Sequence, residues 1–147
     1  MTTNHTLSTP ARIVLAEDDR TAAVLIEIAL KRTGIAHTLE VVTDGDQAIS
    51  VLDRQAPDLL LLDLHMPGKN GFEVLDYVRG REHLRRIPVV MLSASASAAD
   101  RERAYDLHVN AYVKKHTDFA ELSRTLDSIV NFWLRTATHY TLSAAPR

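Results

Sequence analysis

Five polar residues, each standing at or directly after the end of a short apolar run, could together carry out chemistry on a phosphoryl group. They are Glu17, Asp18, Asp63, Ser93 and Lys115. Three carboxylates placed together raise one another's pKa, and a divalent cation relieves that repulsion while all of them stay ionised. Oxygen ligands without cysteine or paired histidines favour Mg²⁺ over zinc. Beside such a cation, a carboxylate nucleophile, a hydroxyl and an ammonium group suit phosphoryl transfer.

Each of these residues also has an ordinary structural interpretation. Asp18 and Asp19 can cap the helix that follows them, and for Asp19 this is the interpretation we favour. Ser93 can end a turn, and Lys115 can be half of a solvated lysine pair. Asp63 is harder to explain, because an acid that closes an apolar strand has no evident packing role. The occurrence of these residues at four strand ends, in order, favours the chemical interpretation.

Alternating strands and helices must bring these side chains to one place. We expect strands over 12–16, 38–42, 58–63, 87–92 and 111–114, and helices over 20–32, 46–54, 72–79, 98–107 and 117–135. The apolar run 59–62 shows no alternation, as expected for a central parallel strand covered on both faces. The pattern predicts an α/β fold with a doubly wound five-stranded parallel sheet and helices on both faces. In such sheets the functional site lies beyond the carboxyl ends of the strands.

The composition fits one globular domain. The chain has 147 residues, of which 46% are hydrophobic and 24% charged, so it can bury a core. A net charge of -2 gives it no bulk positive field for binding nucleic acid, and the absence of cysteine excludes thiolate chemistry. Because it shows neither a secretory signal nor an apolar run that could span a bilayer, we expect a cytoplasmic protein without membrane partners. We divide it into an N-terminal tail (1–11), a domain (12–135) and a C-terminal tail (136–147).

The sequence resembles the receiver domains of bacterial two-component response regulators. The resemblance covers roughly 12–135 and rests on four ordered stretches, namely 13–19, 59–71, 88–94 and 111–115. It implies a flavodoxin-like sheet with the strand order 2-1-3-4-5. It also implies that Asp63 is the phosphoacceptor, that Asp18 binds Mg²⁺ directly and that Glu17 acts on the metal largely through water. The backbone carbonyl of His65 would supply a further metal ligand.

The same resemblance assigns the residues of a conformational switch. Ser93 matches the hydroxyl that senses the phosphate, Lys115 the lysine that pairs with it, and Tyr112 the aromatic residue whose rotamer follows the switch. Two positions depart from the family pattern. His116 stands where the family usually has proline in a cis peptide, which puts the shape of that loop in question. His65 replaces the commoner asparagine, and its imidazole is the alternative metal ligand.

The C-terminal part looks like the small regulators that partner phytochrome-type sensor histidine kinases. The matching stretches are 110–115 and 128–137, and we expect no output domain. One face of the last helix should pack on the sheet through Phe119, Leu122, Leu126, Ile129, Val130 and Trp133. Phe132 and Leu134 are then left over, and we expect them to form a homodimer interface together with the neighbouring strand and helix. The alternative is that 136–142 folds back and covers them.

The sequence therefore predicts a stand-alone response regulator. Asp63 would accept a phosphoryl group from a sensor histidine kinase, and the phosphate would change a protein-binding surface. A receiver-like binding module that does not use phosphorylation is the first alternative. A magnesium phosphohydrolase that acts on small substrates is the second.

Overall fold

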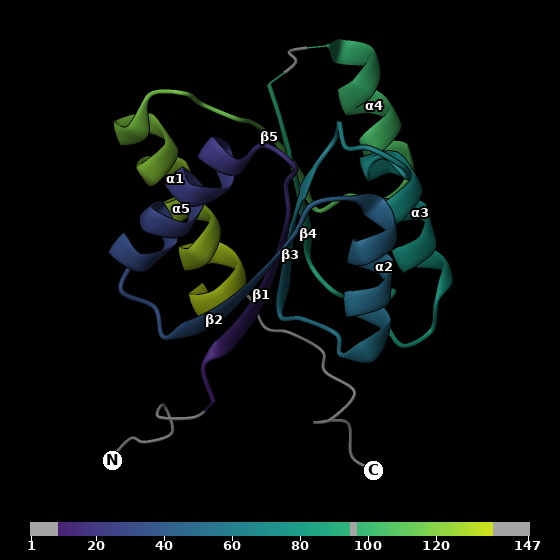
Figure 1. The fold of residues 1–147 in the computed structure, drawn as a ribbon, viewed down its shortest axis with the longest axis horizontal. Helices are drawn as coiled ribbons and strands as arrows, with labels where there is room; N and C mark the ends of the chain where they lie inside the picture. The colour runs from purple at the N-terminus through teal and green to yellow at the C-terminus, as the bar shows by residue number, and fades with distance from the viewer. Residues whose placement is uncertain (1–8, 95–96, 137–147) are drawn as a thin grey trace.

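A computed structural model describes residues 9–94 and 97–136, and these form one five-stranded parallel sheet (Figure 1). The spatial order is β2-β1-β3-β4-β5 and every neighbouring pair is parallel, which confirms the predicted topology. The strands are β1 (Ala11–Ala16), β2 (His37–Val42), β3 (Leu59–Asp63), β4 (Val89–Ser93) and β5 (Ala111–Lys114). β4 begins two residues later than expected, directly after Pro88, which has no amide hydrogen to donate to a neighbouring strand.

Five helices cover the two faces of the sheet (Figure 1). They are α1 (Arg20–Arg32), α2 (Gly45–Arg54), α3 (Gly71–Gly80), α4 (Ala98–Asp106) and α5 (Phe119–Val130). α1 and α5 pack on one face in a cluster with Leu61 and Leu92, and α2, α3 and α4 pack on the other with Leu60 and Leu62. All five residues of β3 are buried, as the continuous apolar run predicted.

The helix starts are fixed by side chains that accept hydrogen bonds from the first turn. Asp19 caps α1 by accepting from the amides of Thr21 and Ala22, at 3.0 and 3.4 Å, which confirms the capping role predicted for it. Asn70 and Glu73 form a reciprocal capping box at the start of α3. These caps fix where the chain leaves β1 and returns after β3, so they also fix the strand ends that carry the predicted site.

The last helix differs from the expected single helix over 117–135. α5 ends at Val130 and continues as a π-helical segment, Asn131–Thr136. A π-helical turn is wider than an α-helical one and changes which side chains face the sheet. Trp133 and Leu134 both pack against the α1/α5 cluster, so the prediction that Leu134 is left over is wrong. Phe132 is 52% exposed, and its ring meets that of Trp133 edge to face. Of the predicted tail segment 136–142, Thr136 belongs to this π-helical segment and the rest lies outside the described residues.

Within 9–94 and 97–136, no helix combines the length and the apolar character that a bilayer crossing requires.

Candidate functional site

The carboxyl ends of β1 and β3 bring three acidic side chains together, as predicted. Oxygen atoms of Glu17, Asp18 and Asp63 lie within 4.8 Å of one another. β1 and β3 are neighbours in the sheet with Ala16 opposite Leu62, so the residues that follow or end these two strands meet at one edge. Glu17 is 1% and Asp63 4% exposed, while Asp18 is open to solvent. Two buried carboxylates and one exposed carboxylate therefore share a site at the sheet edge.

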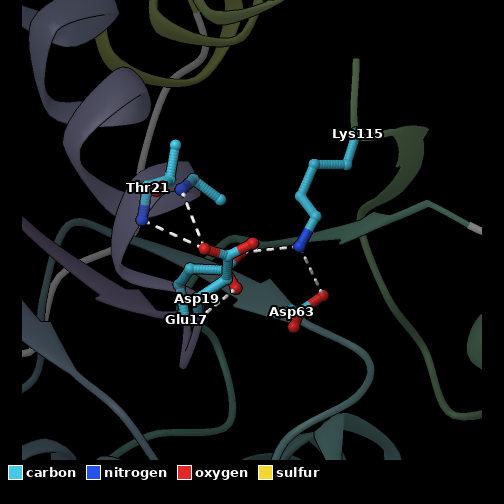
Figure 2. Close-up of polar contacts among 6 residues, drawn as sticks. Glu17, Asp19, Thr21, Asp63 and Lys115 are labelled. Carbon is cyan, nitrogen blue, oxygen red and sulfur yellow. Dashed lines mark hydrogen bonds and ion pairs between the residues drawn. The ribbon is translucent and has the colours of Figure 1, made fainter. Parts of the chain in front are cut away.

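Lys115, directly after β5, reaches across β4 into this cluster (Figure 2). Its Nζ lies 2.8 Å from Glu17 Oε1 and 3.3 Å from Asp63 Oδ1. The Lys115 amide donates to the carbonyl of Ser93 at 2.8 Å, which ties the lysine backbone to the end of β4. Three carboxylates and one ammonium leave a formal local charge of -2. A divalent cation carries the charge that would balance it.

Burial and the neighbouring charges change the pKa of Asp63. Burial, followed by the charge of Glu17, raises the pKa of Asp63 from 3.8 to about 6, although Lys115 acts in the opposite direction. Burial works against the charge of Lys115, but its hydrogen bond to Glu17 and the charges of Asp63 and Glu17 outweigh that effect and raise the Lys115 pKa. At neutral pH Asp63 is mostly ionised and Lys115 is protonated. The site thus holds a carboxylate nucleophile beside a cation.

The predicted switch residues lie on β4 and β5. Ser93 is fully buried and is the last residue of β4. In the sheet it lies opposite Lys114 of β5. Tyr112 is partly buried against the α2/α3/α4 cluster, and its hydroxyl is buried without a hydrogen-bond partner among the described residues. The Tyr112 amide donates to the hydroxyl of Tyr105 in α4 at 3.2 Å. The structure places Tyr112 on the edge strand that leads to Lys115.

Gly71 fixes the backbone that carries Asp63, a role that the sequence analysis missed. The Gly71 amide donates to the Leu64 carbonyl at 2.8 Å. A Cβ at position 71 would lie 2.7 Å from the Asp63 carbonyl oxygen and 2.9 Å from the Leu64 Cα. Any other residue would have to displace this backbone, and with it the Asp63 carboxylate. The sequence signal was present, since this glycine directly follows the Asn70 cap of α3.

Asp19 also has a second part in the site that its capping role did not suggest. Its amide donates to Glu17 Oε2 at 3.0 Å, so the backbone holds the Glu17 carboxylate from the side opposite Lys115 (Figure 2). A carboxylate with one oxygen on an amide and the other on an ammonium has little freedom to rotate. This contact could not be read from residue types, because it depends on the turn between β1 and α1.

The two histidines that depart from the family pattern have exposed or partly exposed side chains. His65 is exposed, and the metal-ligand role of its backbone carbonyl stays a prediction. The peptide between Lys115 and His116 is not cis, and His116 Nδ1 lies 3.0 Å from Glu121 Oε1. His83 and His37 contact Asp53 and the Ile35 carbonyl. His5 and His139 lie outside the described residues.

The donor set fits a hard divalent cation. All three clustered groups are carboxylates, which are the ligands that Mg²⁺, Mn²⁺ and Ca²⁺ share. The acidic cluster could therefore hold a metal ion.

Comparison with known families agrees with this geometry. The family model for the response regulator receiver domain matches residues 13–127. The chain is 40% identical over 131 residues to the probable methanogenesis regulatory protein FilR2 of Methanothrix harundinacea, a match that covers 85% of this chain and 84% of FilR2. It is 38% identical over 136 residues to response regulator Rcp1 of Synechocystis sp., covering 88% of this chain and 92% of Rcp1. The chain belongs to the response regulator receiver family.

Solved structures show the same relationship. The Mn²⁺-bound form of Rcp1 superposes with a TM-score of 0.82 at 37% identity, covering 90% of this chain and 100% of that structure. The phosphorylated cyanobacterial phytochrome response regulator RcpA superposes with a TM-score of 0.86 at 38% identity, with the same coverage. The fold is that of receiver domains, and the chain is a response regulator similar to phytochrome response regulators.

Proposed function

We propose that this receiver acts as a stand-alone phosphoacceptor whose output is a changed protein-binding surface. Asp63 takes a phosphoryl group from a phosphohistidine of a sensor histidine kinase. The observation that carries this proposal is the buried Asp63 carboxylate, held 3.3 Å from the Lys115 ammonium and crowded by Glu17 and Asp18. Its chemistry is limited to its own phosphorylation and dephosphorylation.

The transfer needs little more than a positioned nucleophile and nearby positive charge. An oxygen of the Asp63 carboxylate forms the new P–O bond while the P–N bond of the phosphohistidine breaks. The imidazole leaves with the bonding electron pair and takes a proton from solvent. Lys115 neutralises oxygens of the phosphoryl group as it arrives, and the Ser93 hydroxyl donates a hydrogen bond to the product phosphate. Water later hydrolyses the acyl phosphate and returns Asp63 to the carboxylate.

Mg²⁺ is the cation that we assign to the acidic cluster. Asp18 and Asp63 would bind it directly, Glu17 largely through water, and the carbonyl of His65 would complete the protein ligands. When bound, it supplies positive charge to the carboxylates and to the phosphoryl oxygens. Support comes from the all-oxygen donor set and from the local charge of -2.

The phosphate would act on the molecule through Ser93, Lys115 and Tyr112. Ser93 and Lys115 move to meet the new charge, and the surface around Tyr112 repacks. The buried Tyr112 hydroxyl supports this step, because an unsatisfied buried hydroxyl costs about 1–3 kcal/mol. That cost brings an alternative conformation of this side chain closer in free energy.

A phytochrome-type sensor histidine kinase is the partner that we propose as donor. The support is similarity to Rcp1 and to RcpA, which is a cyanobacterial phytochrome response regulator. We place both proteins in the cytoplasm and assign no role to nucleic acid or membrane. The alternative function, a binding module that does not use phosphorylation, is disfavoured because such a module gains nothing from a crowded acidic site.

Mass spectrometry after incubation with acetyl phosphate and Mg²⁺ tests the proposal. We expect one phosphoryl group per chain, mapped to Asp63, and no labelling in Asp63→Asn or in excess chelator, because the amide is not nucleophilic and the bare carboxylates repel the donor. Asp76→Asn, an exposed carboxylate on α3, is the matched control. Undiminished labelling of the Asp63→Asn variant would contradict the assignment. Many turnovers of donor per chain would indicate the phosphohydrolase instead.

The exposed Phe132 supports a homodimer as the second part of the proposal. Because Leu134 packs inward, Phe132 is the residue of this segment that an interface would cover. Its ring is held edge to face on Trp133, so a partner would meet a preformed aromatic surface. The interface would be built on α5 and its π-helical extension together with the neighbouring strand and helix.

Sedimentation at matched micromolar concentrations tests the dimer. We expect wild type to form a dimer. The dimer of Phe132→Ala should have a dissociation constant at least about tenfold higher, because the variant loses one buried aromatic anchor. Val24→Ala on α1, where the side chain is 44% exposed, is the control and should behave as wild type. A wild type that stays monomeric both with and without beryllofluoride, a phosphate mimic, would show that the dimer proposal is wrong.

A further inference from the structure

The connection between Lys115 and α5 contains a histidine–carboxylate contact that ties the site lysine to a rigid helix. His116 follows Lys115 directly, and its Nδ1 lies 3.0 Å from Glu121 Oε1 in the first turn of α5. The side chains are 27% and 50% exposed, so the pair is partly shielded from water. The next residue of α5, Leu122, is 2% exposed in the α1/α5 cluster. The Glu121 carboxylate is therefore carried by an element that cannot easily move.

A second helix of the same chain shows that this use of the glutamate is specific. In α3, Asn70 caps the amide of Glu73, and the Glu73 carboxylate accepts in return from the Asn70 amide at 2.9 Å. In α5, Asp118 caps the amide of Glu121 in the same way, at 3.1 Å. The Glu121 carboxylate, however, is directed to His116. The Glu73 carboxylate thus completes the cap of α3, while the Glu121 carboxylate contacts the loop that carries Lys115.

We propose that His116 is a positioning residue for Lys115, and that its contact with Glu121 holds the ammonium group where an arriving phosphoryl group needs it. The Lys115 amide is already fixed on the Ser93 carbonyl. The pair with Glu121 fixes the other side of the same residue, so the backbone from which the long lysine side chain extends is held at both ends. This inference rests on the proposed phosphorylation of Asp63 and adds the residue that keeps its cation in place.

The charged groups that the structure places near His116 are Glu121 from α5 and, in the same loop, Lys115 and Asp118. The Lys115 side chain is directed to Glu17 and Asp63, and Asp118 caps α5. Glu121 is thus the charged group that faces His116.

The test is the rate at which acetyl phosphate and Mg²⁺ label Asp63 in the full chain. We expect His116→Ala and Glu121→Gln each to slow labelling about threefold, the size that loss of one partly exposed contact allows. The double variant should be no slower than either single variant, because the two residues act as a pair. His83→Ala is the matched control: His83 Nε2 also lies 3.0 Å from a carboxylate, that of Asp53, on the α2/α3 side of the molecule.

Rescue by a conservative variant separates positioning from a general loss of stability. His116→Gln keeps an N–H group that can contact the Glu121 carboxylate, so its labelling rate should lie closer to that of wild type than the rate of His116→Ala does. Equal rates for wild type and His116→Ala, multiplicative effects in the double variant, or the same slowing in His83→Ala would overturn the inference. An unlabelled wild type would instead contradict the proposed function, and this inference would fall with it.

Discussion

The two ends of the sheet handle buried charge in opposite ways. At the carboxyl end, Glu17, Asp63 and the exposed Asp18 crowd around a single ammonium, and the pKa of Asp63 is raised to about 6. At the amino end of β4 and β5, the partly buried guanidinium of Arg79 donates only to neutral acceptors. These are the carbonyls of His108, Arg85 and Ile87 and the side chain of Asn110, at 2.8–3.1 Å.

Arg79 and its acceptors therefore form a satisfied network at the amino end. Asn110 Oδ1 accepts both from Arg79 and from the amide of Val89, at 2.7 Å, so it joins the starts of β4 and β5. Farther along the same end, Asp58 accepts from the amide of Arg12 at 2.8 Å. Burial lowers the pKa of Arg79, but an arginine still stays protonated at neutral pH. Burying the guanidinium costs desolvation free energy. Its four hydrogen bonds offset that cost.

The difference shows how stability and function are divided within one sheet. Hydrogen bonds at the amino end fix the strand starts, which leaves the carboxyl end free to hold like charges that lower the stability of the fold. Such repulsion suits a site that must receive a cation and a phosphoryl group. The cation offsets the negative charge, and the phosphoryl group reacts with an ionised carboxylate. If this division is correct, changes at the two ends should affect different properties.

The largest expected effect is at the amino end. Arg79→Ala should lower the free energy of unfolding by about 3 kcal/mol, because it removes several hydrogen bonds from a charged donor and leaves buried acceptors unpaired. Chemical denaturation measures this directly. The rate of labelling at Asp63 should stay within about twofold of wild type under conditions where the variant is folded, because the change lies at the opposite end of the strands.

Two further variants sharpen that result. Arg79→Lys keeps the charge but loses the planar fork that reaches four acceptors, so it should recover less than half of the lost stability. Arg101→Ala, on the exposed surface of α4, should change stability by no more than about 0.5 kcal/mol. A marked slowing of labelling in folded Arg79→Ala would break the comparison, since the two ends would then be coupled.

Sequence reasoning found the carboxyl end and missed the amino end for a physical reason. Asp63 and Lys115 are polar residues at the ends of apolar strands, where residue type and position alone suggest chemistry. Arg79 is one of several arginines in a helix, and its role depends on the turn at His108, which has a positive φ of 68° and presents its carbonyl to the guanidinium. Long-range geometry of this kind leaves no local pattern in the sequence.

The same reasoning explains the mixed outcome at the C-terminus. The apolar spacing of Leu122, Leu126 and Ile129 has the α-helical period and predicted their burial. The change to a π-helical turn after Val130 alters that period, so Leu134 was assigned to the surface although it packs inward. Periodicity predicts a helix face only as long as the helix type stays constant.

The smaller expected effect is at the carboxyl end and has the opposite sign. Without metal, Asp63→Asn should raise the free energy of unfolding at pH 7 by about 2 kcal/mol, because it removes a charge that burial and Glu17 disfavour. The folded-state pKa of Asp63 is about 6 and its ordinary value 3.8, so the ionised carboxyl destabilises the fold fully above pH 6 and not at all below pH 3.8. The advantage of the asparagine variant should therefore shrink as pH falls from 6 to 4. Denaturation in excess chelator across this range is the measurement.

Mg²⁺ should narrow the difference in stability between wild type and Asp63→Asn and so complete the comparison. Wild type should gain stability from the ion by linkage, by about 1 kcal/mol at a concentration several times the dissociation constant, while Asp63→Asn gains less because it has lost a charged ligand. Arg79→Ala should gain as much as wild type, because its defect lies at the other end of the sheet. If Asp63→Asn is instead less stable than wild type at pH 7 in chelator, then Lys115 and the Asp19 amide already neutralise the crevice, and the acidic cluster is a structural ion-pair network with no need of a cation.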